Sequence, residues 1–162
     1  MKYKYTPYLF KILIYFAQLY PIGRSKFAPG TAASLFTIFL GYFLLSTLSL
    51  NEVIIFLIII TIIAFYSIKF YLKRYKINDP KEIVIDEFVG QLISLLILPI
   101  LTIEINFISL FIAFCTFRFF DITKIGLNRI EKIPGAWGVL LDDVFAGLYS
   151  CIIQFIYWEH LT

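Results

Sequence analysis

Residues 31–50 read TAASLFTIFLGYFLLSTLSL and include no charged side chain. A helix that crosses the hydrocarbon core of a bilayer needs about 20 mostly apolar residues. This stretch therefore predicts a transmembrane helix. Outward from it in both directions, the chain repeats the same alternation of long apolar runs and short polar connections.

The composition agrees with a membrane protein. Of the 162 residues, 60% are hydrophobic and 15% are charged, whereas soluble domains carry about 25% charged residues. Disorder is excluded by this apolar content. The net charge of +3 is too small, and its Lys and Arg residues too dispersed, to indicate a nucleic-acid partner.

Four further apolar stretches follow the first one, at residues 53–72, 83–103, 105–120 and 138–158. Residues 8–20 are also apolar, but Lys11 interrupts them and Pro7 and Pro21 bound them, so an interfacial or re-entrant helix fits better than a span. We expect an all-α, polytopic membrane helical bundle with about five transmembrane helices. It forms a single integral-membrane domain over residues 1–162, with an N-terminal interfacial segment (1–30) and a helical bundle (31–158).

The positions of the basic residues predict the orientation. If five spans alternate, all fourteen Lys and Arg residues fall on one side, and the other side keeps Glu52, Glu104 and Glu159 as its charges, with His160. Loops rich in Lys and Arg stay in the cytoplasm. The N-terminus is then inside and the C-terminus outside.

The two cysteines, Cys115 and Cys151, lie in apolar stretches without metal-ligand spacing. We expect two small buried hydrophobic side chains rather than a disulfide or a zinc site.

Two pairs of adjacent acids stand near the start of predicted spans, Asp86-Glu87 and Asp142-Asp143. Carboxylates at this depth cost a few kcal/mol unless they are paired, metal-bound or hydrated. Acidic residues are also favoured at helix N-termini by the macrodipole, but two adjacent pairs would repel each other without a cation between them. Oxygen ligands alone suit Mg²⁺ or Mn²⁺.

Small residues predict that the two acid-bearing helices approach closely. Asp86 and Gly90 share one face of their helix, and a four-residue spacing joins Gly138, Asp142, Ala146 and Ser150 on the other. Small residues allow close helix contact in membranes. The carboxylates are then expected to converge.

Anion-binding groups are predicted on the same side. Gly30-Thr31 opens the first span, where free backbone N–H groups attract anions. Arg24 and Lys26 precede it, and Arg118 stands one turn before Asp121. Taken singly, Arg24 and Lys26 are equally well explained as basic residues that keep their loop in the cytoplasm. Arg118 is different, because it lies within an apolar segment. Together the acids and cations indicate phosphate chemistry.

Four blocks of sequence carry a family resemblance. They read FAPGTAASL at 27–35, DPKEIVIDEFVGQ at 79–91, FRFFDITK at 117–124 and GAWGVLLDDVFAG at 135–147. In this order they resemble the phosphatidylglycerophosphatase A family of bacterial lipid phosphatases. Ile125, where the family usually has Pro, and Ala136, where Gly is common, depart from its pattern.

The resemblance implies a Mg²⁺-dependent, multi-pass enzyme of the bacterial inner membrane with its active site on the cytoplasmic face. It would convert phosphatidylglycerophosphate, its lipid substrate in the bilayer, to phosphatidylglycerol and phosphate in glycerophospholipid synthesis. The expected catalytic residues are Asp86, Glu87, Asp121, Asp142 and Asp143, and the expected metal ligands are Asp79, Asp86, Glu87, Asp142 and Asp143. The expected phosphate-binding residues are Arg24, Lys26, Gly30, Thr31, Arg118 and Lys124.

Two alternatives stay open at this point. The attacking group is either a water molecule or one of the carboxylates, through an aspartyl-phosphate. The other class of function is a small cation transporter or membrane interaction subunit that uses the acids as an ion path. Such a path predicts acids distributed through the depth of the bilayer, whereas the sequence gathers them toward one face.

Overall fold

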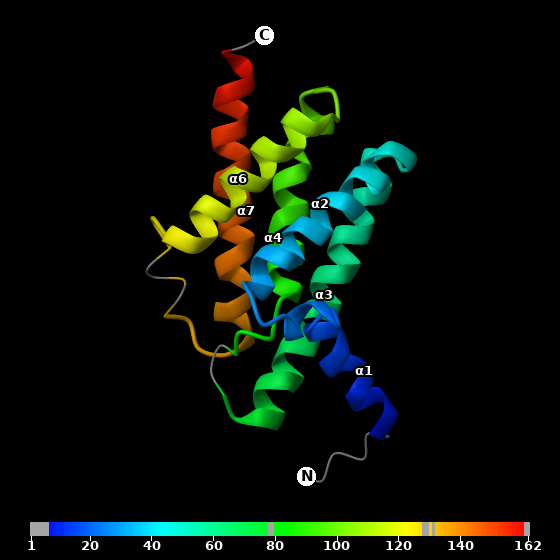
Figure 1. Ribbon diagram of the computed structural model, residues 1–162, viewed down its shortest axis with the longest axis vertical. Helices are drawn as coiled ribbons and strands as arrows, with labels where there is room; N and C mark the ends of the chain where they lie inside the picture. The colour runs from blue at the N-terminus through cyan, green and yellow to red at the C-terminus, as the bar shows by residue number, and fades with distance from the viewer. Residues whose placement is uncertain (1–6, 78–79, 128–129, 131, 161–162) are drawn as a thin grey trace.

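The computed structural model describes residues 7–77, 80–127, 130 and 132–160, and every regular element in these ranges is a helix (Figure 1). The predicted all-α class is therefore confirmed. The elements are α1 (Pro7–Ala17), the 3-10 turn η1 (Ile22–Arg24), α2 (Pro29–Thr47), α3 (Leu50–Tyr75), α4 (Ile85–Leu95), α5 (Ile97–Ile100), α6 (Phe107–Thr123) and α7 (Ala136–Glu159).

Three helices are long and apolar enough to cross a membrane, namely α2, α3 and α7. The predicted count of about five is not confirmed, because α6 has 17 residues and α4 only 11. The expected continuous span over residues 83–103 is divided into α4 and α5. Pro99 explains the division, since it lacks an N–H group and its ring clashes with the carbonyl four residues earlier, at Leu95.

Side-chain caps fix the starts of two helices. At α3, the Ser49 side chain accepts a hydrogen bond from Glu52 N, while the Glu52 carboxylate accepts one from Ser49 N at 2.8 Å. Asn106 and Ser109 form the same reciprocal pair at the start of α6. Such capping boxes satisfy backbone N–H groups that have no partner within the helix. The first of these caps lies where the chain reverses direction between α2 and α3 (Figure 1).

Helix α4 is the centre of the bundle. Nine of its eleven residues are buried, and α2, α3, α6 and α7 all pack against it. Val89, Leu92 and Leu95 have no exposed surface. Figure 1 shows α4 between α2 and α7. A short helix enclosed in this way presents its first turn to the neighbouring helix ends rather than to lipid.

The outer surface of the bundle is apolar. Phe39 on α2, Ile58 on α3 and Phe107 on α6 are 76%, 54% and 81% exposed. Extensive exposed apolar surface is typical of a membrane contact. Cys115 belongs to this surface, so its predicted burial is wrong, whereas Cys151 is half-buried; both thiols are free. An apolar sequence context does not distinguish a lipid-facing position from a protein core.

Helices α4 and α7 cross at two glycines. A Cβ added at Gly90 would overlap the backbone oxygen of Asp143 and the ring of Phe117, and one added at Gly147 would overlap the oxygen of Gly90. The predicted close approach of the acid-bearing helices is confirmed. The contact brings the first turn of α4 beside the second turn of α7.

Neutral polar side chains fill the deeper part of the same interface. Ser94 Oγ lies 2.7 Å from Ser150 Oγ, which lies 2.6 Å from Thr116 Oγ1. The Gln154 side-chain amide donates to Ser94 O at 3.0 Å. We call these four residues, Ser94, Thr116, Ser150 and Gln154, the polar cluster. It joins α4, α6 and α7 by hydrogen bonds.

Helix α1 lies along α3 (Figure 1), with the Phe10 and Phe70 rings 5.4 Å apart. The predicted N-terminal helix is therefore present, although it ends at Ala17; its position at the membrane interface stays a prediction. Ala17 O accepts a hydrogen bond from Val84 N at 3.0 Å. This bond attaches the end of α1 to the residues that lead into α4.

Candidate active site

A cavity of about 620 Å³ opens where α2, α4 and α7 begin and α6 ends. Its lining includes the five acids predicted to be catalytic. The charged side chains that line it are Asp86, Glu87, Asp121, Asp142 and Asp143 with Lys81, Arg118, Lys124 and Lys132. Residues from four separate segments of the chain thus meet at one place.

Three of the acids form a tight group that we call the carboxylate cluster: Asp86, Glu87 and Asp143. One oxygen from each lies within 4.8 Å of the others. Asp86 and Asp143 are only 7% and 4% exposed. The first turn of α4 supplies two members and α7 supplies the third, so the glycine crossing of these helices determines the geometry.

Gly30 makes room for the carboxylate cluster. A Cβ at this position would overlap Glu87 Oε1 and lie 3.3 Å from Arg118 Nη1. The first turn of α2 can therefore approach both side chains closely. Gly30, which was predicted to bind phosphate, lines the cavity, and its missing side chain is what admits Glu87.

The carboxylate cluster fits a hard divalent cation. Asp86 Oδ1 and Glu87 Oε2 are buried and have no hydrogen-bond partner among the described residues. The three groups supply oxygen ligands only, which suits Mg²⁺ or Mn²⁺ rather than zinc. Burying several carboxylate oxygens close together costs free energy unless a cation lies between them.

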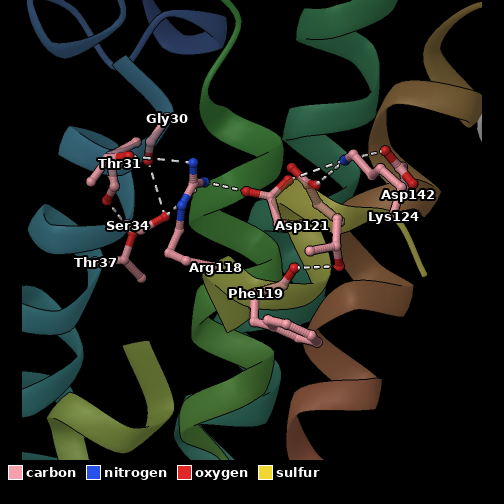
Figure 2. A network of polar contacts seen from close by, with 12 residues as sticks. Gly30, Thr31, Ser34, Thr37, Arg118, Phe119, Asp121, Lys124 and Asp142 are labelled. Atoms are coloured by element: carbon pink, nitrogen blue, oxygen red, sulfur yellow. Dashed lines mark hydrogen bonds and ion pairs between the residues drawn. The ribbon is translucent and has the colours of Figure 1, made fainter. Parts of the chain in front are cut away.

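Arg118 connects α6 to the start of α2 (Figure 2). Its Nη2 donates to Thr31 Oγ1 at 3.3 Å and its Nη1 donates to Ser34 Oγ at 3.5 Å. The same guanidinium pairs with Asp121, one turn further along α6. The one-turn spacing of Arg118 and Asp121 in the sequence thus corresponds to an ion pair in the structure. Three partners fix the direction of the guanidinium beside the cavity.

Lys124 caps the C-terminus of α6 in the left-handed backbone region, with φ of 54°. Its Nζ pairs with Asp142 and lies 3.1 Å from Asp121 Oδ1 and 3.6 Å from Asp143 Oδ1 (Figure 2). Burial alone would lower the pKa of Lys124, but the carboxylates of Asp143, Asp142 and Asp121 outweigh it and raise the pKa above its ordinary value. The three carboxylates therefore favour the charged form of Lys124.

The geometry divides the five acids into two groups. Asp86, Glu87 and Asp143 face one another, whereas Asp121 and Asp142 lie closest to Arg118 and Lys124. Asp143 also pairs with Lys124, at the longer distance of 3.6 Å. Adjacent residues of a helix point about 100° apart, so Asp142 and Asp143 meet different neighbours. The sequence did not separate these roles.

The remaining predicted residues lie in three places. Thr31 lines the cavity. Arg24 and Lys26 do not; they line a neighbouring hollow of about 490 Å³. Asp79 lies outside the described residues.

Two charged residues that line the cavity, and one polar residue beside it, were not among the predicted site residues. Lys81 and Lys132 line the cavity directly, and Ser34 holds Arg118. Lys81 and Ser34 stand inside two of the four sequence blocks, which was the available signal. Apart from its charge, nothing in the sequence indicated that Lys132 lies at the site.

Comparison with known sequences identifies the family. The model of the family described as phosphatidylglycerophosphatase A matches residues 15–158. A phosphatidylglycerophosphatase A of Haemophilus influenzae is 36% identical over 135 residues, which cover 81% of this chain and 80% of the relative. One of Escherichia coli is 29% identical over 140 residues, which cover 85% and 78%.

A third relative carries a different name. A Bacteroides thetaiotaomicron protein, provisionally named a phosphatidylinositol-3-phosphatase, is 36% identical over 135 residues, or 81% of this chain and 84% of the relative. No solved structure matches the chain. The family match covers all the cavity acids among the described residues. This protein belongs to the phosphatidylglycerophosphatase A family.

Proposed function

We propose that this protein hydrolyses the phosphomonoester of phosphatidylglycerophosphate, releasing phosphatidylglycerol and phosphate. One observation carries the proposal: the carboxylate cluster, in which Asp86 and Asp143 are buried and Glu87 is half-buried, lines the same cavity as the cations Arg118 and Lys124 at the ends of four helices. Anion-binding and metal-binding groups side by side are what phosphoryl transfer requires.

The chain's cations bind the phosphate in this proposal. Arg118 presents a planar fork of donors, which matches phosphate oxygens, and Thr31 and Ser34 hold it in place. Lys124 adds a second positive charge from the end of α6. Asp121 and Asp142 orient these two cations rather than bind metal. A phosphate that arrives at the site therefore meets donors whose direction is already fixed.

The carboxylate cluster is the proposed magnesium site, with Asp86, Glu87 and Asp143 as ligands. A bound divalent cation supplies charge stabilisation to phosphoryl oxygens and makes water a better nucleophile. In the net reaction the bond from phosphorus to the glycerol oxygen breaks and a bond to the water oxygen forms. The glycerol oxygen leaves with a proton, and the phosphate keeps the other one.

We further propose that the cavity faces the cytoplasm at the inner membrane of a bacterium. The α2–α3 turn and the end of α7 lie toward one end of the molecule, and the end of α3 and the start of α7 toward the other (Figure 1). Basic residues gather in the connections of the second end, which favours a cytoplasmic position. Five crossings then require α6 and the α4–α5 pair to pass through the bilayer within the bundle.

The alternative of an ion path has no support in the described residues. All buried acids among them line one cavity, whereas the polar cluster deeper in the bundle is neutral. A continuous path for cations needs charged or hydrated groups along its length.

Phosphate release from purified, detergent-solubilised protein tests the proposal. Phosphatidylglycerophosphate and phosphatidylinositol 3-phosphate are each supplied with Mg²⁺ or with EDTA. We expect Mg²⁺-dependent release from phosphatidylglycerophosphate. Faster release from the inositol lipid would transfer the assignment to that substrate, and no release from either would overturn it.

The variants Asp86→Asn and Glu104→Gln provide the matched comparison. Asp86 is buried in the cluster, whereas Glu104 is exposed in the connection before α6. Only the first variant should lose turnover, and both should keep the elution profile of the folded protein in detergent. Full activity in Asp86→Asn would contradict the assigned site.

A further inference from the structure

A second hollow, of about 490 Å³, adjoins the cavity and has no role in the scheme above. Pro29 and Lys81 line both spaces, so the two are neighbours that share part of their walls. The second hollow is formed by the end of α1, the turn η1, the last turns of α3 and the residues before α4.

Backbone contacts build the second hollow as a fixed structure. Gly23 N donates to Gln18 O at 2.8 Å, and a Cβ at Gly23 would overlap the backbone oxygen of Glu82. The turn η1 is thus pressed against the segment that leads into α4. Only glycine allows this approach, so the two segments that supply the cations of the hollow are held together.

The hollow is positively charged. Among the described residues, Arg24, Lys26 and Lys81 line it together with the carboxylate of Glu82, so these residues leave two positive charges in excess. Arg24 is held over the ring of Tyr20, with 5.3 Å from its guanidinium carbon to the ring centre. Such a surface attracts an anion and presents more than one donor to it.

A buried acceptor lies beside these cations. Gln18 is 3% exposed and its amide nitrogen donates to the Tyr71 hydroxyl at 3.3 Å. Its Oε1 is buried without a hydrogen-bond partner among the described residues. Because a buried carbonyl oxygen without a donor is costly, this side chain favours a ligand that brings a hydroxyl group as well as negative charge.

Exposed aromatic rings flank the cations of the hollow. Tyr20 is 52% exposed and Phe27 is 86% exposed. Aromatic side chains are enriched at the level of lipid headgroups. The hollow is therefore expected at the depth where the phosphodiester of a phospholipid lies.

We propose that the second hollow binds the phosphodiester of the lipid substrate while the cavity holds its phosphomonoester. This inference rests on the proposed function and extends it to how the substrate is selected. Phosphatidylglycerophosphate and phosphatidylinositol 3-phosphate both carry a phosphodiester and a phosphomonoester joined by a polyol that keeps at least one free hydroxyl group. Two adjoining anion sites fit this shared pattern, and they disfavour lipids or soluble esters with one phosphate.

Separate binding of the two reaction products tests the assignment. Short-chain phosphatidylglycerol carries only the phosphodiester, and inorganic phosphate carries only the group released in the cavity. Both are titrated calorimetrically, with Mg²⁺ present, into wild type and into the double variant Arg24→Gln/Lys26→Gln. We expect the Kd of phosphatidylglycerol to rise at least about tenfold in the variant and the Kd of phosphate to stay the same.

Lys11→Gln is the matched control. Lys11 stacks on the Tyr15 ring of α1 in the way that Arg24 stacks on Tyr20, but it does not line the hollow. Its loss should leave the affinity for phosphatidylglycerol unchanged. Equal weakening in the control and the double variant would reveal a general charge effect and overturn the inference.

Measuring turnover of the lipid substrates distinguishes a failure of this inference from a failure of the proposed function. If wild type releases no phosphate from either lipid, the proposed function fails, and the calorimetric result still decides whether the hollow binds a phosphodiester. If wild type is active, the double variant should raise KM for phosphatidylglycerophosphate about tenfold with a smaller change in kcat. Unchanged KM together with unchanged Kd would overturn the second site.

Discussion

Two groups of buried polar residues lie along the same interface of α4, α6 and α7, and they differ in how they are satisfied. The polar cluster, with Ser94 and Ser150 at its centre, consists of neutral groups that are each both donor and acceptor. The carboxylate cluster, with Asp86 and Asp143, consists of groups that only accept when ionised. Both are buried at the contact between helices.

The difference separates a structural interaction from a functional one. The hydroxyl groups and the amide N–H group of the polar cluster bond to one another and to a backbone carbonyl, so they join the helices directly, and Gln154 Oε1 alone in this cluster is buried without a hydrogen-bond partner among the described residues. Three carboxylates within 4.8 Å of one another repel instead, and they are held in place by the rest of the fold. Evolution retains such a cost where a cation or a substrate is bound.

The largest expected effect follows from removing one member of the carboxylate cluster. Asp143→Asn keeps the side-chain shape and removes a ligand charge, so turnover of phosphatidylglycerophosphate should fall about 10²- to 10³-fold. Phosphate release at saturating Mg²⁺ measures it. An Asp143→Asn enzyme with wild-type turnover would place the chemistry elsewhere.

Arg118→Lys should have the next largest effect. A lysine keeps the charge but cannot contact Thr31, Ser34 and Asp121 together, so kcat/KM should fall about 10- to 100-fold. The control is Arg74→Lys on the exposed last turn of α3. Equal activity of the two variants would show that charge alone is needed at position 118.

Gly90→Ala should separate the two acid-bearing helices. The added methyl group would overlap the Asp143 backbone and the Phe117 ring, which should cost about 1–3 kcal/mol of stability. Thermal unfolding in detergent measures this cost. Gly41→Ala is the comparison, because its Cβ would meet only the flexible end of the Leu95 side chain. A larger loss at position 41 would contradict the crossing described for α4 and α7.

Ser150→Ala should give the smallest effect. It removes the hydroxyl that joins Ser94 and Thr116, at a cost of about 0.5–1.5 kcal/mol. Turnover should stay near that of wild type, because the polar cluster supports packing only. A loss of turnover as large as that of Asp143→Asn would erase the distinction between the two groups.

Much of the site was predictable because it depends on local spacing. Asp86 and Gly90 are one turn apart, so a close crossing at the glycine brings the carboxylate toward the partner helix. The Arg118–Asp121 pair likewise follows from helical periodicity. The start of α2 at Pro29 follows from the preference of proline for a first turn.

Other features depend on tertiary contacts that spacing does not encode. Whether Asp142 or Asp143 joins the cluster depends on the rotation of α7 against α4 and α6. Arg24 lies outside the cavity because η1 turns the chain toward the end of α3. The break after Leu95 had a visible cause in Pro99, but the apolar run around it predicted a continuous helix.

The central claim is that Asp86, Glu87 and Asp143 hold a divalent cation. Asp142, in contrast, is assigned to orient Lys124. A measurement of metal binding tests this difference most directly. Purified wild type, Asp143→Asn and Asp142→Asn are titrated with Mn²⁺ as a spectroscopic substitute for Mg²⁺, and bound metal is measured by electron paramagnetic resonance. We predict that Asp143→Asn loses tight Mn²⁺ binding and that Asp142→Asn keeps it. Equal loss in both variants, or loss in Asp142→Asn alone, would contradict it.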